Sequence, residues 1–249
     1  MGKDVNTIAN LGKRPIGFEP RLAADFPGVN PRWHAVEQAR LAMAPWSSIC
    51  AISITQGGSV QLAGTGWLAG PETVITAAHV IAGVSRGNDS LGYEVKFPGI
   101  SAAFTALDAR YHERYRGNAN SLFDTFDIAA LRIAPPGLAG LAIADNVPAD
   151  AFVEVAGYPS IEQGRLVTHE SRALRLSDGV VLHEADTKEG HSGAPVLITR
   201  GSGESRAVIA LHIHGFKANP DESRFPSHNV ALAIESELAA FVRAHLDAT

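Results

Sequence analysis

The chain has 249 residues, of which 45% are apolar and 19% are charged, and its formal charge is −5 at pH 7. These values are typical of a globular protein with one large domain or two small halves, and the acidic balance argues against a nucleic-acid-binding surface. No run approaches the roughly 18 apolar residues that span a bilayer. The first 25 residues lack the apolar core of a signal peptide, so we expect a cytoplasmic protein. A secreted protein whose leader is absent from this sequence is the alternative.

The predicted elements begin with an N-terminal extension over residues 1–45. An Asn-Pro pair supplies a good helix cap and a good first helical residue, so the sequence predicts a helix over about residues 31–43. From residue 46 onward, short β-rich runs alternate with Gly and Pro turns, which is typical of an all-β sandwich or barrel. In the last segment apolar residues recur at helical spacing, and this pattern predicts a helix over about residues 233–247.

Cys50 is the single cysteine, so the chain forms no internal disulfide. It lies in the strand-like run SSICAISI, which favours a buried apolar thiol over a nucleophile, because a reactive thiolate needs an electropositive and partly exposed setting. A metal site is also disfavoured. His212 and His214 share one face of a predicted strand, but no third ligand stands at a metal-binding spacing. We therefore expect no metal and no cofactor.

Three short segments carry residue types that hydrolytic chemistry uses. In TAAHV, His79 follows two alanines, and small neighbours allow an imidazole to face a cleft as a general base. In DIAAL, Asp127 begins an apolar run, where a partly buried carboxylate can hold a histidine tautomer. In GHSGAPV, Ser192 lies in a tight loop rich in glycine. Taken singly, each has a structural alternative: a core histidine, a turn-capping aspartate and a structural turn.

The loop around Ser192 also predicts an oxyanion hole, because such a loop can aim the backbone N–H groups of Gly190 and Ser192 at one point. An α/β-hydrolase is excluded, since that fold needs G-x-S-x-G before a helix, with Asp and His after the Ser. Here position 194 is Ala, a strand-like run follows, and His79 and Asp127 precede Ser192.

TAAHV, DIAAL and GHSGAPV resemble the three catalytic motifs of the chymotrypsin-like serine peptidases, in that family's order. The resemblance extends to the C-terminus and covers most of the chain. It implies an all-β fold of two six-stranded antiparallel β-barrels, over about residues 46–145 and 146–232, closed by the C-terminal helix. It also implies a triad in which Ser192 is the nucleophile, His79 the base and Asp127 the residue that orients the base.

Within that family the chain is similar to the bacterial glutamyl endopeptidase branch. DTKEGHSGAPV, the Gly-Tyr-Pro turn at 157–159 and VIALHIHG carry the similarity. The branch implies a substrate pocket at Thr187, His212 and Gly215, in which a hydroxyl and an imidazole donate hydrogen bonds to a substrate carboxylate. For His212, a strand residue satisfied within the core is the alternative.

The acidic residues near this pocket argue in the other direction. Asp186 stands where trypsin-type enzymes keep the carboxylate that binds Lys or Arg, and Glu189 adds a second acid. We expect cleavage after Glu or Asp; cleavage after Lys or Arg, or a broader specificity, is the alternative. His191 replaces the Asp that pairs with a freed N-terminus in animal digestive relatives. We interpret it as a residue that orders the loop, and not as a zymogen switch or a second base.

Peptides and proteins are the expected substrates, and we expect neither nucleic acid nor membrane as a partner. Two further hypotheses stay open: a cytoplasmic protease-fold effector that a regulatory protein partner activates, and a non-catalytic binding module on the same fold. The N-terminal extension predicts activation by cleavage near Ala23–Asn30, and an arm that docks permanently on the barrel or on a partner is the alternative.

Overall fold

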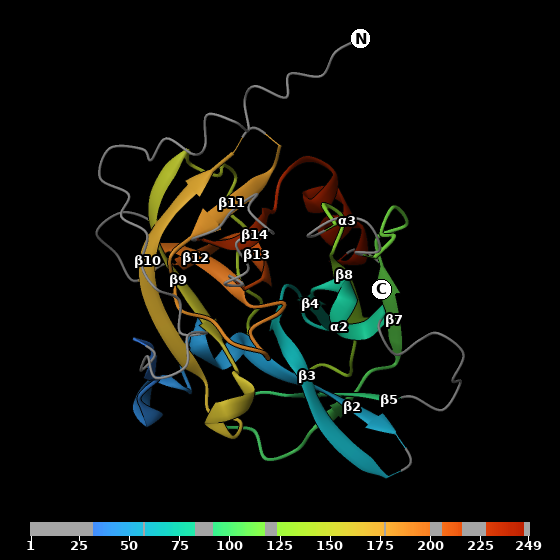
Figure 1. Ribbon diagram of the computed structural model, residues 1–249. Helices are drawn as coiled ribbons and strands as arrows, with labels where there is room; N and C mark the ends of the chain where they lie inside the picture. The colour runs from blue at the N-terminus through green and yellow to red at the C-terminus, as the bar shows by residue number, and fades with distance from the viewer. Residues whose placement is uncertain are drawn as a thin grey trace.

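Two antiparallel β-sheets form the framework of the computed structural model (Figure 1). The structure describes residues 32–56, 58–82, 92–117, 124–176, 178–199, 206–215 and 228–246. The predicted cap at Asn30 and the predicted cleavage region near Ala23–Asn30 lie outside these ranges. None of the described helices is long and apolar enough to cross a membrane.

The first sheet comes from the N-terminal half of the chain. Its strands are β2 (Ile49–Gln56), β3 (Ser59–Leu68), β4 (Thr73–Thr76), β5 (Gly92–Lys96), β6 (Phe104–Thr105), β7 (Asp108–Tyr111) and β8 (Ala129–Arg132). They lie in the order β6-β5-β2-β3-β4-β8-β7, and every pair is antiparallel. In the described part of the chain no ladder joins the edge strands β6 and β7, so this sheet is curled but open.

The second sheet comes mainly from the C-terminal half. Its strands are β1 (His34–Ala35), β9 (Asp150–Gly157), β10 (Val167–Arg175), β11 (Val180–His183), β12 (Pro195–Thr199), β13 (Arg206–His214) and β14 (Asn229–Ala233). The order is β1-β10-β11-β14-β13-β12-β9, and β9 also pairs with β10. That last ladder closes six strands into a barrel, which β1 joins at β10.

The predicted fold class, an all-β antiparallel double barrel with a C-terminal helix, is confirmed, with one difference in each half. Each sheet has seven described strands where six were expected. In the second half the extra strand is β1, a segment ahead of the barrel that uses the edge of β10. In the first half β6 has only two residues, which is too short a ladder to close the sheet.

Helices are few and short. The two described α-helices are α2 (Ala78–Ala82) and α3 (Ser236–Leu246), and the 3-10 turns are η2 (Gln38–Arg40), η3 (Trp46–Ser48) and η4 (Ser160–Glu162). The predicted C-terminal helix is present and begins three residues later than expected, because Ala233 still belongs to β14. It lies beside β4, where the Thr73 hydroxyl donates to the carbonyl of His245 at 2.8 Å.

The helix predicted over residues 31–43 is wrong. Its described part forms the short strand β1 and the 3-10 turn η2 instead. Backbone pairing of β1 with β10 and burial of Trp33 against Val167 hold this segment extended along the second barrel. Such tertiary contacts commonly outweigh a weak local preference for helix.

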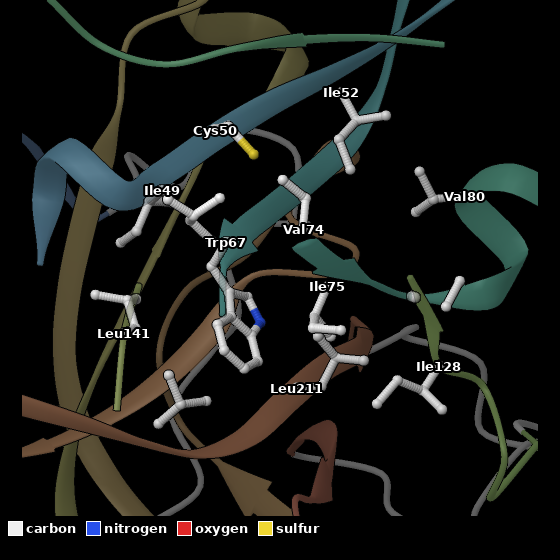
Figure 2. Close-up of a cluster of buried hydrophobic side chains, with 14 of the residues drawn as sticks. Ile49, Cys50, Ile52, Trp67, Val74, Ile75, Val80, Ile128, Leu141 and Leu211 are labelled. Atoms are coloured by element: carbon white, nitrogen blue, oxygen red, sulfur yellow. The ribbon is translucent and has the colours of Figure 1, made fainter. Parts of the chain in front are cut away.

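The largest hydrophobic cluster belongs to both halves. Figure 2 shows Trp67 and Ile75 of the first sheet beside Leu211 of β13 in the second, and all three are fully buried. Cys50 lies in the same cluster, and burial raises the pKa of its thiol, as expected for an apolar and unreactive cysteine. The shared core fixes the two sheets against each other and so fixes any site built between them.

Candidate active site

His79 and Asp127 form a two-point contact at the edge of the first sheet. Strand β4 leads through two buried alanines into α2, whose second residue is His79. Asp127 lies two residues before β8, the neighbour of β4. One carboxylate oxygen accepts the His79 backbone N–H at 2.8 Å, and the other lies 2.6 Å from the His79 Nδ1. Asp127 therefore caps the helix and orients the imidazole at once.

This contact fixes the tautomer of His79. A carboxylate only accepts hydrogen bonds, so the Nδ1 of His79 carries the proton and the Nε2 is the basic atom. The Asp127 side chain is 1% exposed, whereas the His79 side chain is 31% exposed. The carboxylate is thus shielded from water, while the ring that it orients remains accessible from solvent.

The loop that carries Ser192 connects β11 to β12 and contains residues 184–194. The His191 backbone N–H donates to the carbonyl of Lys188 at 3.0 Å, and the Lys188 N–H donates to the Nδ1 of His191 at 3.1 Å. Gly190 and Gly193 have φ values of +98° and +87°, a region that favours glycine. Burial lowers the pKa of His191 to about 4, so its ring is neutral and orders the loop from inside.

Thr65 of β3 attaches this loop to the other half of the molecule. Its backbone N–H donates to the carbonyl of Ser192 at 2.8 Å, and its hydroxyl donates to the carbonyl of Gly190 at 2.7 Å. The same hydroxyl accepts the backbone N–H of Tyr158 at 2.9 Å. Thr65 is fully buried, so these bonds are shielded from water.

Gly193 brings the Ser192 loop close to the segment that carries His79. A Cβ added at Gly193 would lie 2.1 Å from the Thr65 carbonyl oxygen and 3.0 Å from the Ala77 backbone nitrogen. Ala77 stands two residues before His79, so this close approach brings the Ser192 loop against the segment that presents the imidazole. In the part of the chain that the structure describes, no hydrogen bond joins Ser192 to His79. Catalytic hydrogen bonds are often long until substrate binds.

The backbone around Ser192 offers two N–H groups to an anion. The carbonyl of Glu189 accepts the Ser160 N–H at 2.9 Å. Because the C=O and N–H of a trans peptide point in opposite directions, the Gly190 N–H points away from Ser160. Neither the Gly190 N–H nor the Ser192 N–H has a backbone acceptor among the described residues. Both N–H groups predicted from the sequence as oxyanion donors thus lack a backbone partner in the described structure.

Arg32, in the segment before β1, binds the carboxylate of Asp186. The Arg32 backbone N–H and Nε donate to one carboxylate oxygen at 2.7 and 3.1 Å, and its Nη2 lies 2.5 Å from the other. Burial alone would raise the pKa of Asp186, but the hydrogen bonds and charge of Arg32 outweigh it and hold that pKa below its ordinary value. Glu189, the other acid of concern, is exposed to solvent, which screens its charge.

His212 and Thr187 are buried polar residues with unused hydrogen-bonding capacity. The Nδ1 of His212 lies 3.0 Å from the Nε2 of His183, and burial lowers the pKa of both rings, that of His183 to about 3. The remaining His183 nitrogen, Nδ1, has no partner in the described structure, and neither does the Thr187 hydroxyl. Gly215 directly follows β13 and is half-buried.

The His183–His212 pair favours one arrangement of protons. If His212 donated from Nδ1, His183 would bury an unpaired N–H, which is the rarer defect in proteins. If His183 donates from Nε2, only an unprotonated nitrogen is left unpaired, and His212 then carries its proton on Nε2. The Nε2 of His212 therefore carries an N–H donor, while its Nδ1 accepts the hydrogen bond from the Nε2 of His183.

Sequence reasoning missed Arg32, Thr65 and His183. Arg32 and Asp186 are 154 residues apart, and no local pattern connects them. Thr65 lies in a β-rich run where a threonine is ordinary, and His183 ends an apolar strand. For Thr65 and His183 the only available signal was chemical, because each is a polar residue in a run that is otherwise apolar or small, and Arg32 lies in a mixed polar run that gives no such signal.

Known proteins resemble this chain in sequence and in fold. The sequence profile of the trypsin-like peptidase domain matches residues 64–204, more than half of the chain. A curated relative, the glutamyl endopeptidase of Bacillus licheniformis, is 27% identical over 187 residues, which are 69% of this chain and 56% of the relative. The chain thus spans little more than half the length of that relative.

Among solved structures, a Glu endopeptidase in complex with MPD superposes with a TM-score of 0.68 at 17% identity, over 87% of this chain and 97% of that chain. A match at this identity shows a common fold. The profile match, the chain order of the three motifs and the double-barrel architecture agree, and this chain belongs to the trypsin-like peptidase family.

Proposed function

We propose that this chain is a serine endopeptidase whose catalytic residues are Ser192, His79 and Asp127. The observation that carries the proposal is the two-point hold of Asp127 on His79, at 2.8 and 2.6 Å. It leaves the Nε2 of His79 basic, in a ring that solvent reaches. Gly193 packs against the segment before His79, which supports Ser192 as the residue whose hydroxyl proton His79 takes.

In the proposed reaction, His79 is the base and Ser192 is the nucleophile. The Nε2 of His79 takes the proton of the Ser192 hydroxyl as its oxygen attacks the peptide carbonyl carbon. The carbonyl oxygen becomes an oxyanion that accepts the N–H groups of Gly190 and Ser192. The imidazolium gives its proton to the leaving amine as the C–N bond breaks, and an acyl-enzyme remains. Water then repeats the sequence and releases the acid, while Asp127 stays ionised throughout.

For the substrate we propose peptides cut after Glu or Asp. The orphan hydroxyl of Thr187 and the inferred Nε2–H of His212 are donors suited to a carboxylate. A carboxylate in a buried site needs such donors, because an unpaired buried charge is costly. The alternative, cleavage after Lys or Arg, would use the carboxylate of Asp186, and that carboxylate is paired with Arg32.

A peptide-library digest read by mass spectrometry tests both parts of this proposal. We expect cleavage mainly after Glu and Asp. Ser192→Ala should lower turnover by roughly 10³-fold or more, while Ser171→Ala on β10 serves as the matched control. Equal rates for the parent and Ser192→Ala would refute the catalytic assignment, and cleavage mainly after Lys or Arg would refute the specificity.

Labelling with a fluorophosphonate distinguishes the remaining hypotheses. Labelling at Ser192 is expected of a peptidase, whereas an unlabelled and inert protein indicates a binding module. Inert protein that gains activity with a partner from the same cell indicates a latent effector.

Activation by cleavage near Ala23–Asn30 is a separate hypothesis. Cleavage there would leave Arg32 and β1 within the chain. We expect protein trimmed to about residue 30 to turn over substrate faster than protein that starts at Met1. Equal turnover of the two would refute this hypothesis.

A further inference from the structure

We propose that Arg32 determines the charge preference of the substrate pocket. Arg32 neutralises Asp186, so the pocket accepts acidic substrate side chains. Replacing Arg32 by an uncharged residue shifts the preference toward basic side chains. The inference rests on the proposed function, because it assigns the residue behind that specificity.

The contact between the two residues is extensive. Arg32 donates to both carboxylate oxygens of Asp186, from its backbone N–H, its Nε and its Nη2, and Nη2 also lies 3.3 Å from the carbonyl of Glu184. A guanidinium that holds both oxygens of a carboxylate is among the strong ion-pair geometries. Arg32 uses three of the roughly four acceptor positions of the Asp186 carboxylate, so a second guanidinium cannot bind both oxygens in the same way.

Asp186 is much more deeply buried than Arg32, so the charge of Asp186 depends on Arg32 for compensation. The Asp186 side chain is 1% exposed and the Arg32 side chain is 34% exposed. Hydrogen bonding to Asp186 raises the pKa of Arg32. A buried carboxylate without its partner would be left as an uncompensated charge in a region of low dielectric constant.

Backbone and side-chain contacts hold the segment around Arg32 against the second barrel. β1 pairs with β10, and the Val36 N–H donates to the carbonyl of Leu166 at 2.9 Å. The indole N–H of Trp33 donates to Glu162 at 3.1 Å, and its ring lies 5.5 Å from the ring of His191. Arg32 is thus held at the base of the same loop that carries the nucleophile.

Asp186 lies directly before Thr187, a residue of the proposed pocket. It begins the segment that ends at Ser192, and the next residue, Thr187, buries an unpartnered hydroxyl. A net negative charge at Asp186 would repel a substrate carboxylate in the proposed pocket and attract a substrate cation. His169 does not replace Arg32, because its Nδ1 accepts the Asp186 N–H at 2.7 Å and is therefore unprotonated.

The test is a charge-balance set of variants: Arg32→Gln, Asp186→Asn and the double variant. Arg172→Gln is the matched control, since that side chain is 32% exposed and pairs with Asp150 in the same barrel. Active enzyme is counted by fluorophosphonate titration, and kcat/KM is measured on two peptides that differ only in Glu or Lys before the scissile bond. Thermal unfolding of each variant shows whether it is folded.

We expect Arg32→Gln to lower the Glu-to-Lys ratio of kcat/KM by at least about tenfold, and the double variant to recover most of that loss. Arg172→Gln should leave the ratio unchanged. If Arg32→Gln does not fold, Asp186→Asn alone must raise the ratio or the inference is wrong. A parent that prefers Glu while the ratio is the same in every variant overturns this inference alone. A parent that titrates with no fluorophosphonate, or that prefers Lys, overturns the proposed function itself.

Discussion

Replacing Thr65 by Val should loosen the nucleophile loop without changing its sequence. Valine keeps the shape of threonine but removes the hydroxyl, which donates to the carbonyl of Gly190 at 2.7 Å and accepts the N–H of Tyr158 at 2.9 Å. The substitution therefore leaves two buried backbone groups without a partner. The backbone bond from Thr65 to Ser192 remains.

The expected cost follows from those two groups. Each buried polar group that loses its partner destabilises a protein by about 1–3 kcal/mol, so Thr65→Val should lower the free energy of unfolding by about 2–6 kcal/mol. Thr65→Ser keeps the hydroxyl and should recover most of this. Thr73→Val removes a single bond, from Thr73 to the carbonyl of His245 near the far end of α3, and serves as the control away from the site.

Two measurements test this reasoning. Urea unfolding gives the stability of each variant, and the rate of fluorophosphonate labelling reports the geometry of Ser192. We expect labelling of Thr65→Val to slow by about tenfold or more, which corresponds to about 1.4 kcal/mol in the activation barrier, while Thr73→Val labels at the parent rate. The reasoning fails if Thr65→Val labels as fast as Thr73→Val and unfolds at the same urea concentration.

Three further predictions concern the same region. Asp127→Asn keeps an acceptor for the His79 N–H but presents an amide to its Nδ1, so kcat/KM should fall by about 10³–10⁴-fold with stability little changed; a loss below about tenfold would contradict the assigned tautomer. Gly193→Ala places a Cβ 2.1 Å from the Thr65 carbonyl oxygen at a φ of +87°, so we expect more than about 3 kcal/mol of destabilisation by urea unfolding, and a well-folded variant would refute the packing. Burial lowers the pKa of His183 to about 3 and of His191 to about 4, so below pH 6.5 the unfolded chain binds protons that the folded chain does not. Stability should be full above that pH and fall toward pH 4, with these two residues contributing up to about 2.7 kcal/mol per pH unit and buried His212 adding to the loss; a flat profile between pH 7 and 5 would contradict this.

The sequence predicts the architecture because the information lies in local runs. Alternating β-rich segments with Gly and Pro turns indicate the two sheets, and helical spacing of apolar residues indicates α3. The helix over residues 31–43 failed because the competing contacts come from distant residues. Trp33 is buried against Val167, a pairing that no window of sequence contains.

The candidate site is predictable only to the same extent. His79, Asp127 and Ser192 stand in short motifs, and the structure brings the first two into direct contact. Whether Asp186 is free to bind a substrate cation is not a local property. Its partner Arg32 lies in the N-terminal segment, and the two meet only because β1 pairs with the second barrel.

The hydrophobic cluster that Trp67 and Leu211 share has a consequence for protein engineering (Figure 2). The two sheets meet through interlocking side chains, so neither half is a module that can be exchanged alone. Consider a chimera that takes its first half from this chain and its second half from a relative. Unless the buried side chains of the two halves fit each other, the Ser192 loop will lose its hydrogen bond from the Thr65 backbone N–H. Recombination within this family should therefore succeed only where the cluster residues of both sheets come from the same parent.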